Sequence, residues 1–208
     1  LIDMGGSTTG YAVFSAGRII HMGNIPIGAQ HITHDLALGL NTSLQQAERL
    51  KTIHGSAVIS PADDEAMIDV PQLGQEEDEE GLQFPRSAII HIIRPRLEEI
   101  FEMIRHRLEA AGLERMSGGR IAITGGGSQL IGLNEMAGKI MGKQSRIAKG
   151  REVEELADAV SGPAFSTVLG MIRYSAIRKQ NMPWLQAEER FSLTAPFRRA
   201  ARWLKENF

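Results

Sequence analysis

The sequence predicts an α/β fold, and three observations lead to that expectation. The chain has 208 residues, of which 42% are hydrophobic, enough for one large core or two modest ones. Short apolar runs of strand character alternate with longer segments whose apolar residues recur at three- and four-residue spacing. Two of the short runs end in glycine-rich turns, where backbone N–H groups can approach an anion without a side chain in the way.

The N-terminal segment predicts a three-stranded meander over residues 1–4, 11–14 and 18–22. The turn after the first strand is the first candidate phosphate-binding turn, made of Gly5, Gly6, Ser7 and Thr8. Asp3 stands at the end of that strand, where a carboxylate could hold a hydrated Mg²⁺ beside phosphate oxygens. We therefore expect Asp3 to bind Mg²⁺ through water.

The middle of the chain predicts helices around short strands. Apolar spacing is helical from residue 31 to 53, and residues 58–59 and 67–70 resemble short strands. The acidic run 76–80 predicts a solvated loop rather than a binding tail. A long helix over 87–111 should close at Gly112 and bury one apolar face, formed by Ile89, Ile93, Leu97, Ile100, Ile104 and Leu108.

A strand over 121–124 leads into the second candidate turn, made of Gly125, Gly126, Gly127 and Ser128, and a helix should follow over 130–141. Strand, glycine turn and helix in that order suit phosphate binding. Taken singly, each of the two turns is equally consistent with a plain tight turn. Neither has the spacing of a Walker loop or of a dinucleotide fingerprint. A further helix is expected over 164–177.

Glu48 and Lys51 lie three residues apart, hence on one face of the expected helix. The pair could hydrogen-bond a ribose or an adenine edge. An ordinary surface ion pair is the alternative reading of the same spacing.

The order of these features resembles the second half of actin-like ATPases, and three motifs resemble the FtsA family closely. Residues 3–8 resemble its second phosphate loop, residues 47–55 its nucleotide-base helix, and residues 123–129 its adenosine loop. The resemblance implies an actin-like (ribonuclease-H-like) ATPase lobe that binds ATP and Mg²⁺. Ser7 departs from the family pattern, which has a third glycine there, and the family's N-terminal half with its first phosphate loop is not in this sequence.

The resemblance also implies a domain layout. Residues 1–41 and 112–178 would form the nucleotide-binding lobe, and residues 42–111 the base-binding helix with an inserted smaller α/β subdomain. Residues 179–195 would be a flexible linker, and residues 196–208 an amphipathic membrane-targeting helix.

The last segment supports that final expectation on its own residues. At about 100° per residue, Phe197, Leu204 and Phe208 fall on one face of a helix and the basic residues on the other, with Trp203 at the flank. The basic residues are Arg198, Arg199, Arg202 and Lys205. Docking of this helix on the protein's own core is the alternative to an anionic membrane surface. No run approaches the roughly 18 apolar residues of a spanning helix.

As a family member, the protein would tether FtsZ filaments to the cytoplasmic face of the cell membrane at the division site. It would self-assemble into filaments and bind other division proteins, as a peripheral membrane protein. Arg86 and Arg96 are the candidates for contact with the FtsZ C-terminal tail, with an ion pair to Glu98 or Glu99 as the alternative.

Other classes of function stay open from the sequence. ATP binding is expected more than fast turnover, and no catalytic residue is assigned. An actin-like chaperone or sugar-kinase-type enzyme, or an FtsA-like pilus-assembly protein, would share the fold. The net charge of -2 gives no general reason to bind nucleic acid.

Overall fold

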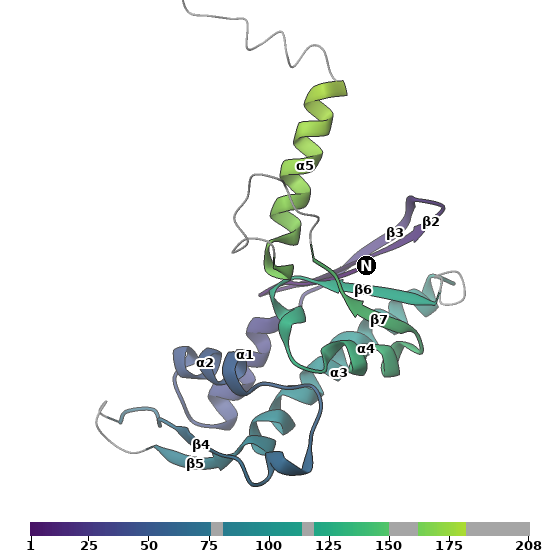
Figure 1. Cartoon of the computed structure of the whole chain (residues 1–208). Coiled ribbons are helices and arrows are strands. Elements are labelled where there is room, and N and C mark those ends of the chain that lie inside the picture. Colours follow the sequence, from purple (N-terminus) through teal and green to yellow (C-terminus); the bar gives the residue numbers. More distant parts are fainter. Residues whose placement is uncertain (76–80, 114–118, 150–161, 182–208) are drawn as a thin grey trace, which may run out of the picture. The chain divides into compact units, whose positions relative to one another are not determined.

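The structure is a computed structural model that describes residues 1–75, 81–113, 119–149 and 162–181. The chain divides into two compact units, Leu1–Thr167 and Val168–Phe208. The first unit contains the main sheet, its helices and the candidate site (Figure 1). The finer division predicted from the sequence, with its inserted subdomain over 42–111, stays a prediction.

A five-stranded mixed sheet forms the centre of the first unit. Strands β1 (Ile2–Met4), β2 (Thr9–Ser15) and β3 (Arg18–Ile25) make an antiparallel meander, which confirms the sequence prediction. Strands β6 (Arg120–Thr124) and β7 (Gln144–Ile147) extend the sheet in parallel, in the order β3-β2-β1-β6-β7. Because β1 and β6 are parallel neighbours, the glycine turns that follow them leave the same edge of the sheet.

Helix α3 (Arg86–Ala110) supplies much of the core. All six apolar residues predicted for its inner face are buried, and Gly112 follows its end with a left-handed φ of 68°, so this prediction is confirmed. The described part also contains α4 (Leu133–Met141), and α5 (Ser166–Asn181), which begins in the first unit and continues into the second.

The predicted helix over residues 31–53 is two helices, α1 (Ala29–Gly39) and α2 (Leu44–His54). Asn41 has a left-handed φ of 52°, and the Thr42 hydroxyl donates to the carbonyl of Pro71. Ser43 then caps α2 by accepting from the Gln46 amide at 3.2 Å. The chain therefore turns here, although its apolar spacing continues through the break.

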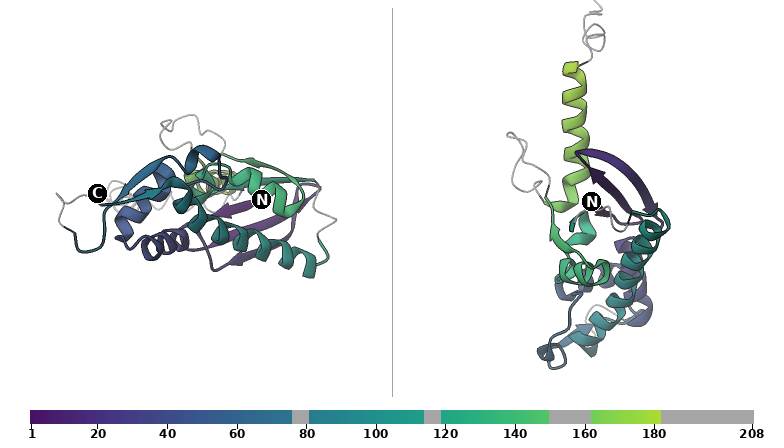
Figure 2. Two further views of the ribbon diagram at one scale, coloured as in Figure 1. Left: turned by 90° about the horizontal axis from the view of Figure 1, so that it is seen from below. Right: turned by 90° about the vertical axis from the view of Figure 1, so that its right-hand side faces the viewer.

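Strands β4 (Met67–Val70) and β5 (Leu82–Pro85) form a separate two-stranded sheet, which lies apart from the main sheet in the right-hand view of Figure 2. The prediction of a strand over 67–70 is confirmed. The prediction of one over 58–59 is wrong: the Ser56 hydroxyl donates to the Val58 carbonyl, and the only bridge here joins Ser56 to Ile131. Short 3₁₀ turns occupy Pro61–Asp63, Gly126–Gln129 and Pro163–Phe165.

Within the described ranges, none of the helices combines the length and the apolarity needed to cross a membrane. The acidic run 76–80 and the predicted membrane-surface helix 196–208 lie outside those ranges, as does most of the predicted linker.

Candidate functional site

The first glycine turn is fixed to the start of α1. The Gly5 amide donates to the Thr8 carbonyl at 3.0 Å, and the amides of Ala29 and Gln30 donate to the carbonyls of Gly5 and Gly6 at 2.9 and 2.8 Å. Gly28 allows this contact, because a Cβ there would lie 2.5 Å from the Gly6 carbonyl oxygen. The carbonyl side of the turn is therefore occupied by α1. No described residue accepts from the amides of Gly6 and Ser7.

The second turn packs directly on the first strand. Gly125 has a φ of 88°, and a Cβ there would lie 2.4 Å from Asp3 Oδ1. A Cβ on Gly127 would lie 2.6 Å from Cγ of Met4, whereas one on Gly126 would meet nothing closer than 3.9 Å. Gly125 and Gly127 are therefore required by packing, and Gly126 is the exposed, unobstructed position of the turn.

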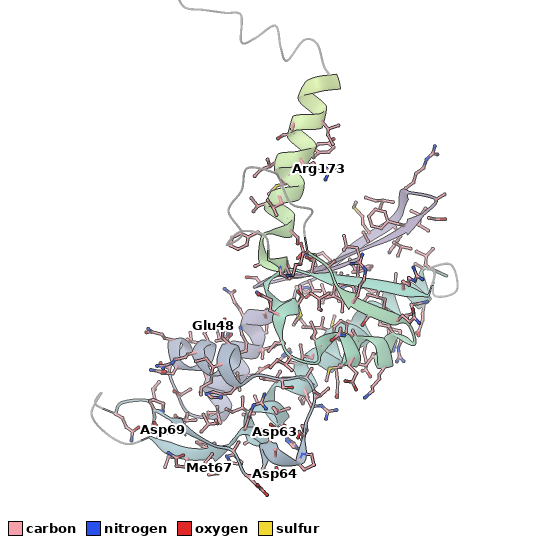
Figure 3. All side chains as sticks on the ribbon, viewed as in Figure 1. Glu48, Asp63, Asp64, Met67, Asp69 and Arg173 are labelled. Carbon is pink, nitrogen blue, oxygen red and sulfur yellow. The ribbon has the colours of Figure 1, made fainter. Side chains whose placement is uncertain are left out.

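One cleft of about 940 Å³ brings the predicted residues together. Its lining includes Gly6 of the first turn, Gly126 and Gly127 of the second, and Glu48 and Lys51 of α2. Figure 3 marks Glu48 on α2. The other predicted residues belong to the two turns or to the end of β1 but are not among the residues that line the cleft: Asp3, Gly5, Ser7, Thr8, Gly125 and Ser128.

Glu48 and Lys51 form an ion pair at one wall of the cleft, with 2.6 Å between Lys51 Nζ and Glu48 Oε2. The Lys51 side chain is only 9% exposed, while that of Glu48 is 53% exposed. Partial burial opposes the charge of Glu48, but hydrogen bonds from Lys51 and Thr33 and the charge of Lys51 outweigh it and lower the pKa of Glu48. Glu48 is thus held ionised, as an acceptor facing the cleft.

Sequence reasoning missed several residues that shape this site. Thr33 and Gln30, from α1, line the cleft, and the Ser7 hydroxyl donates to Gln30 Oε1 at 2.9 Å. Thr167 donates to Asp3 Oδ2 at 2.6 Å. Thr33 lies four residues after Ala29, so the two residues share one face of α1, and this spacing could have been used to predict Thr33 as a site residue. The partnership of Thr167 with Asp3, 164 residues away, left no local signal.

The donor set at Asp3 fits a hydrated Mg²⁺ rather than a protein-caged metal. Asp3 provides a single carboxylate at the sheet edge, and the described ranges hold no cluster of three or more His, Cys, Asp or Glu residues suited to a metal. Mg²⁺ commonly keeps several waters and takes one or two carboxylates together with substrate phosphates. Its presence here stays a prediction.

Arg86 and Arg96 have carboxylate partners within the first unit. Arg86 pairs with the buried Asp63, which Figure 3 labels, and donates from Nε to the His54 carbonyl at 3.0 Å. Arg96 holds Asp35 through two bonds of 2.7 and 3.0 Å and also pairs with Glu99, which confirms one of the ion pairs offered as the alternative. The bonds to Asp35 raise the pKa of Arg96, so its charge is permanent. Contact with another protein stays a prediction for both arginines.

Solved structures identify the fold. The chain matches the crystal structure of MreB5 of Spiroplasma citri bound to ADP with a TM-score of 0.65 and 20% identity, over 86% of this chain and 54% of the other. At that identity the likeness concerns the fold alone. The first unit has the fold of the actin-like ATPases, with its cleft at the edge of the sheet where β1 and β6 end.

Sequence comparison defines the family. The family model described as "Cell division protein FtsA" matches residues 1–170. The cell division protein FtsA of Agrobacterium fabrum is 40% identical over the whole of this chain, and that of Pseudomonas aeruginosa is 32% identical over the same extent. The chain belongs to the FtsA family of cell-division proteins. It spans about half the length of these curated relatives, 47% and 50% respectively.

Proposed function

We propose that the cleft is the half-site at which an actin-like cell-division protein binds ATP. The observation that supports this most is convergence: Gly6, Gly126 and Glu48, from three separate segments, line one cleft. Its volume of about 940 Å³ is ample for a nucleotide. MreB5 of Spiroplasma citri, which has the same fold, was crystallised with ADP bound.

Each wall has its own role in this proposal. The amides of Gly6 and Ser7 hold phosphate oxygens, and Gly126 lets the ligand approach the second turn closely. Glu48 accepts hydrogen bonds from the ribose hydroxyls. Asp3, held by Thr167, would hold a hydrated Mg²⁺ through water. A bound Mg²⁺ would neutralise phosphate charge. No residue in the cleft is assigned as a general base. In this proposal ATP acts as a switch more than as a rapidly consumed substrate.

At the level of the whole protein, we propose that it tethers FtsZ filaments to the cytoplasmic face of the membrane at the division site. Residues 196–208 supply the tether, and assembly into actin-like filaments multiplies individually weak membrane contacts. The support is membership of the FtsA family together with the amphipathic, basic sequence of that segment.

A valine at position 126 tests nucleotide binding. A Cβ there meets no atom closer than 3.9 Å, so Gly126→Val should fold normally while filling the approach to the second turn. In titration calorimetry with Mg·ATP, the full-length protein carrying this change should bind at least about tenfold more weakly, a loss of about 1.4 kcal/mol.

The matched control is Gly119→Val, because a Cβ at position 119 also meets nothing within 4 Å but lies at the opposite end of β6. It should leave both the affinity for ATP and the unfolding temperature unchanged. Equal ATP affinity of wild type, Gly126→Val and Gly119→Val would remove the cleft as the nucleotide site.

A further inference from the structure

Gln30 is a residue of the cleft to which the proposed function gives no role. It stands at the start of α1 and lines the cleft together with Gly6. A Cβ added to Gly6 would lie 3.3 Å from Cδ and 3.5 Å from Nε2 of Gln30. The backbone amide of Gln30 also donates to the Gly6 carbonyl at 2.8 Å. The carboxamide of Gln30 therefore lies directly against the first glycine turn.

The Ser7 hydroxyl determines which way this carboxamide faces. It donates to Gln30 Oε1 at 2.9 Å, so the oxygen of the planar group is turned toward Ser7 and the nitrogen away from it. A glutamine nitrogen carries two N–H donors. Among the residues that the structure describes, none accepts a hydrogen bond from Gln30 Nε2. Both donors are therefore available to a ligand in the cleft.

Neutral donors gather at this turn. The amides of Gly6 and Ser7 have no acceptor in the described ranges, and Gln30 Nε2 lies beside them. Phosphate oxygens accept several hydrogen bonds at once, and backbone amides in a turn are a common way to supply the donors. The side chain of Gln30 adds a further donor to the two that the backbone provides.

The position of Gln30 along α1 indicates which phosphate it would meet. Thr33, three residues further on, donates to Glu48, the residue to which the proposed function assigns the ribose. At a rise of about 1.5 Å per residue, Gln30 lies about 4.5 Å nearer to the start of α1. That start is bonded to the first turn through the Ala29 amide and the Gly5 carbonyl. Gln30 therefore stands at the end of this wall that is farther from the ribose.

We propose that Gln30 is a direct ligand of the terminal phosphate of ATP, and that Ser7 is a positioning residue that orients its carboxamide. Together they set the preference of the cleft for ATP over ADP, because ADP has no group at that place. This inference rests on the proposed function and names what the site senses when it acts as a switch. The hydroxyl at position 7, where the family pattern has glycine, supplies the orientation in this chain.

The test is the ratio of the dissociation constants for Mg·ADP and Mg·ATP, measured by titration calorimetry on the full-length protein. Gln30→Ala should lower this ratio about tenfold by weakening ATP binding alone, because a hydrogen bond to a charged group is lost. Ser7→Ala should lower it about threefold or more, and Ser7→Thr, which keeps a hydroxyl, should restore it. Both side chains are exposed, so the unfolding temperature should not change.

Gln45→Ala is the matched control. Gln45 is also an exposed glutamine that lines the cleft, but it belongs to α2. Its replacement should leave the affinities for both nucleotides within about twofold of wild type. A double-mutant cycle then tests positioning: Ser7→Ala combined with Gln30→Ala should give the same ratio as Gln30→Ala alone.

Several outcomes would overturn the inference. An unchanged ratio in Gln30→Ala, or equal weakening of ATP and ADP, would remove Gln30 as a ligand of the terminal phosphate. A further fall of the ratio when Ser7→Ala is added to Gln30→Ala would show that Ser7 acts independently of Gln30. In each of these cases ATP still binds and the proposed function stands. Absence of ATP binding by the wild-type protein would end the proposed function as well.

Discussion

At the scale of single residues, the ion pair between Glu48 and Lys51 on α2 is completed by contacts from α1. The three-residue interval between Glu48 and Lys51 predicts that they meet, and they form an ion pair. It cannot show that Lys51 is buried, because the burial comes from α1, which supplies Ala29 and Thr33. Gly6 and Gly126 line one cleft, and their role in binding a nucleotide stays a prediction. The partner of Asp3, Thr167, lies too far along the chain to be predicted.

The ion pair at Glu48 makes a testable contribution to stability against pH. Its folded-state pKa is lowered from the ordinary value of 4.5, so the stabilisation is complete above pH 4.5 and is lost as the pH falls through the lower folded-state value. Wild type should therefore unfold at a higher temperature than Glu48→Gln at pH 7, and the difference should shrink at pH 3.5. Calorimetric unfolding of both proteins at the two pH values measures this. A difference that stays constant between them would contradict the proposed ion-pair contribution.

At the scale of elements, periodicity predicted what local sequence determines. The buried face of α3 and the N-terminal meander agree with their predictions, because regular apolar spacing and turn residues specify both. The break between α1 and α2 was missed, since Thr42 is held by Pro71, a partner from a later segment. Strand β7 was missed because its sequence, Gln-Ser-Arg-Ile, has one apolar residue and pairs only through its neighbour β6.

The cap of α2 tests the importance of that break. Ser43→Ala removes the acceptor for the Gln46 amide and should cost about 1 kcal/mol in the free energy of unfolding. Urea denaturation should show a lower midpoint with an unchanged slope. Ser43→Asp keeps an acceptor at the same place and should retain wild-type stability. If Ser43→Ala were neutral, the hydrogen bond would contribute nothing to holding α2 in place.

At the scale of the whole molecule, the convergence of the two turns depends on chain topology. They are about 120 residues apart in the sequence, and only the parallel pairing of β1 with β6 brings their strand ends together. Neither turn contains this information by itself. The resemblance to the FtsA family implied it, and the pairing of Asp3 with Thr124 in the sheet agrees.

The membrane tether is a prediction at the same scale. Each buried Phe or Leu should contribute about 1.5–3 kcal/mol and each basic residue about 1 kcal/mol at an anionic surface, before ordering costs. The full-length protein should float with phosphatidylglycerol vesicles, and deletion of residues 196–208 should abolish flotation. A control with the same residues of that segment in a non-amphipathic order should also fail to float. Undiminished flotation of the deletion variant would refute the tether.

The packing around three of the glycines also limits which substitutions the protein can accept during evolution. Positions 28 and 125 exclude every side chain. At position 28 an added Cβ would clash with the carbonyl oxygen of Gly6, and at position 125 it would clash with Asp3 while the backbone φ is 88°. Position 126 has no such barrier from the fold. If random substitution were limited only by folding, glycine would be kept at positions 28 and 125 and replaced by other residues at position 126. Persistence of glycine at 126 through many generations would therefore record selection by a ligand, and not by the architecture.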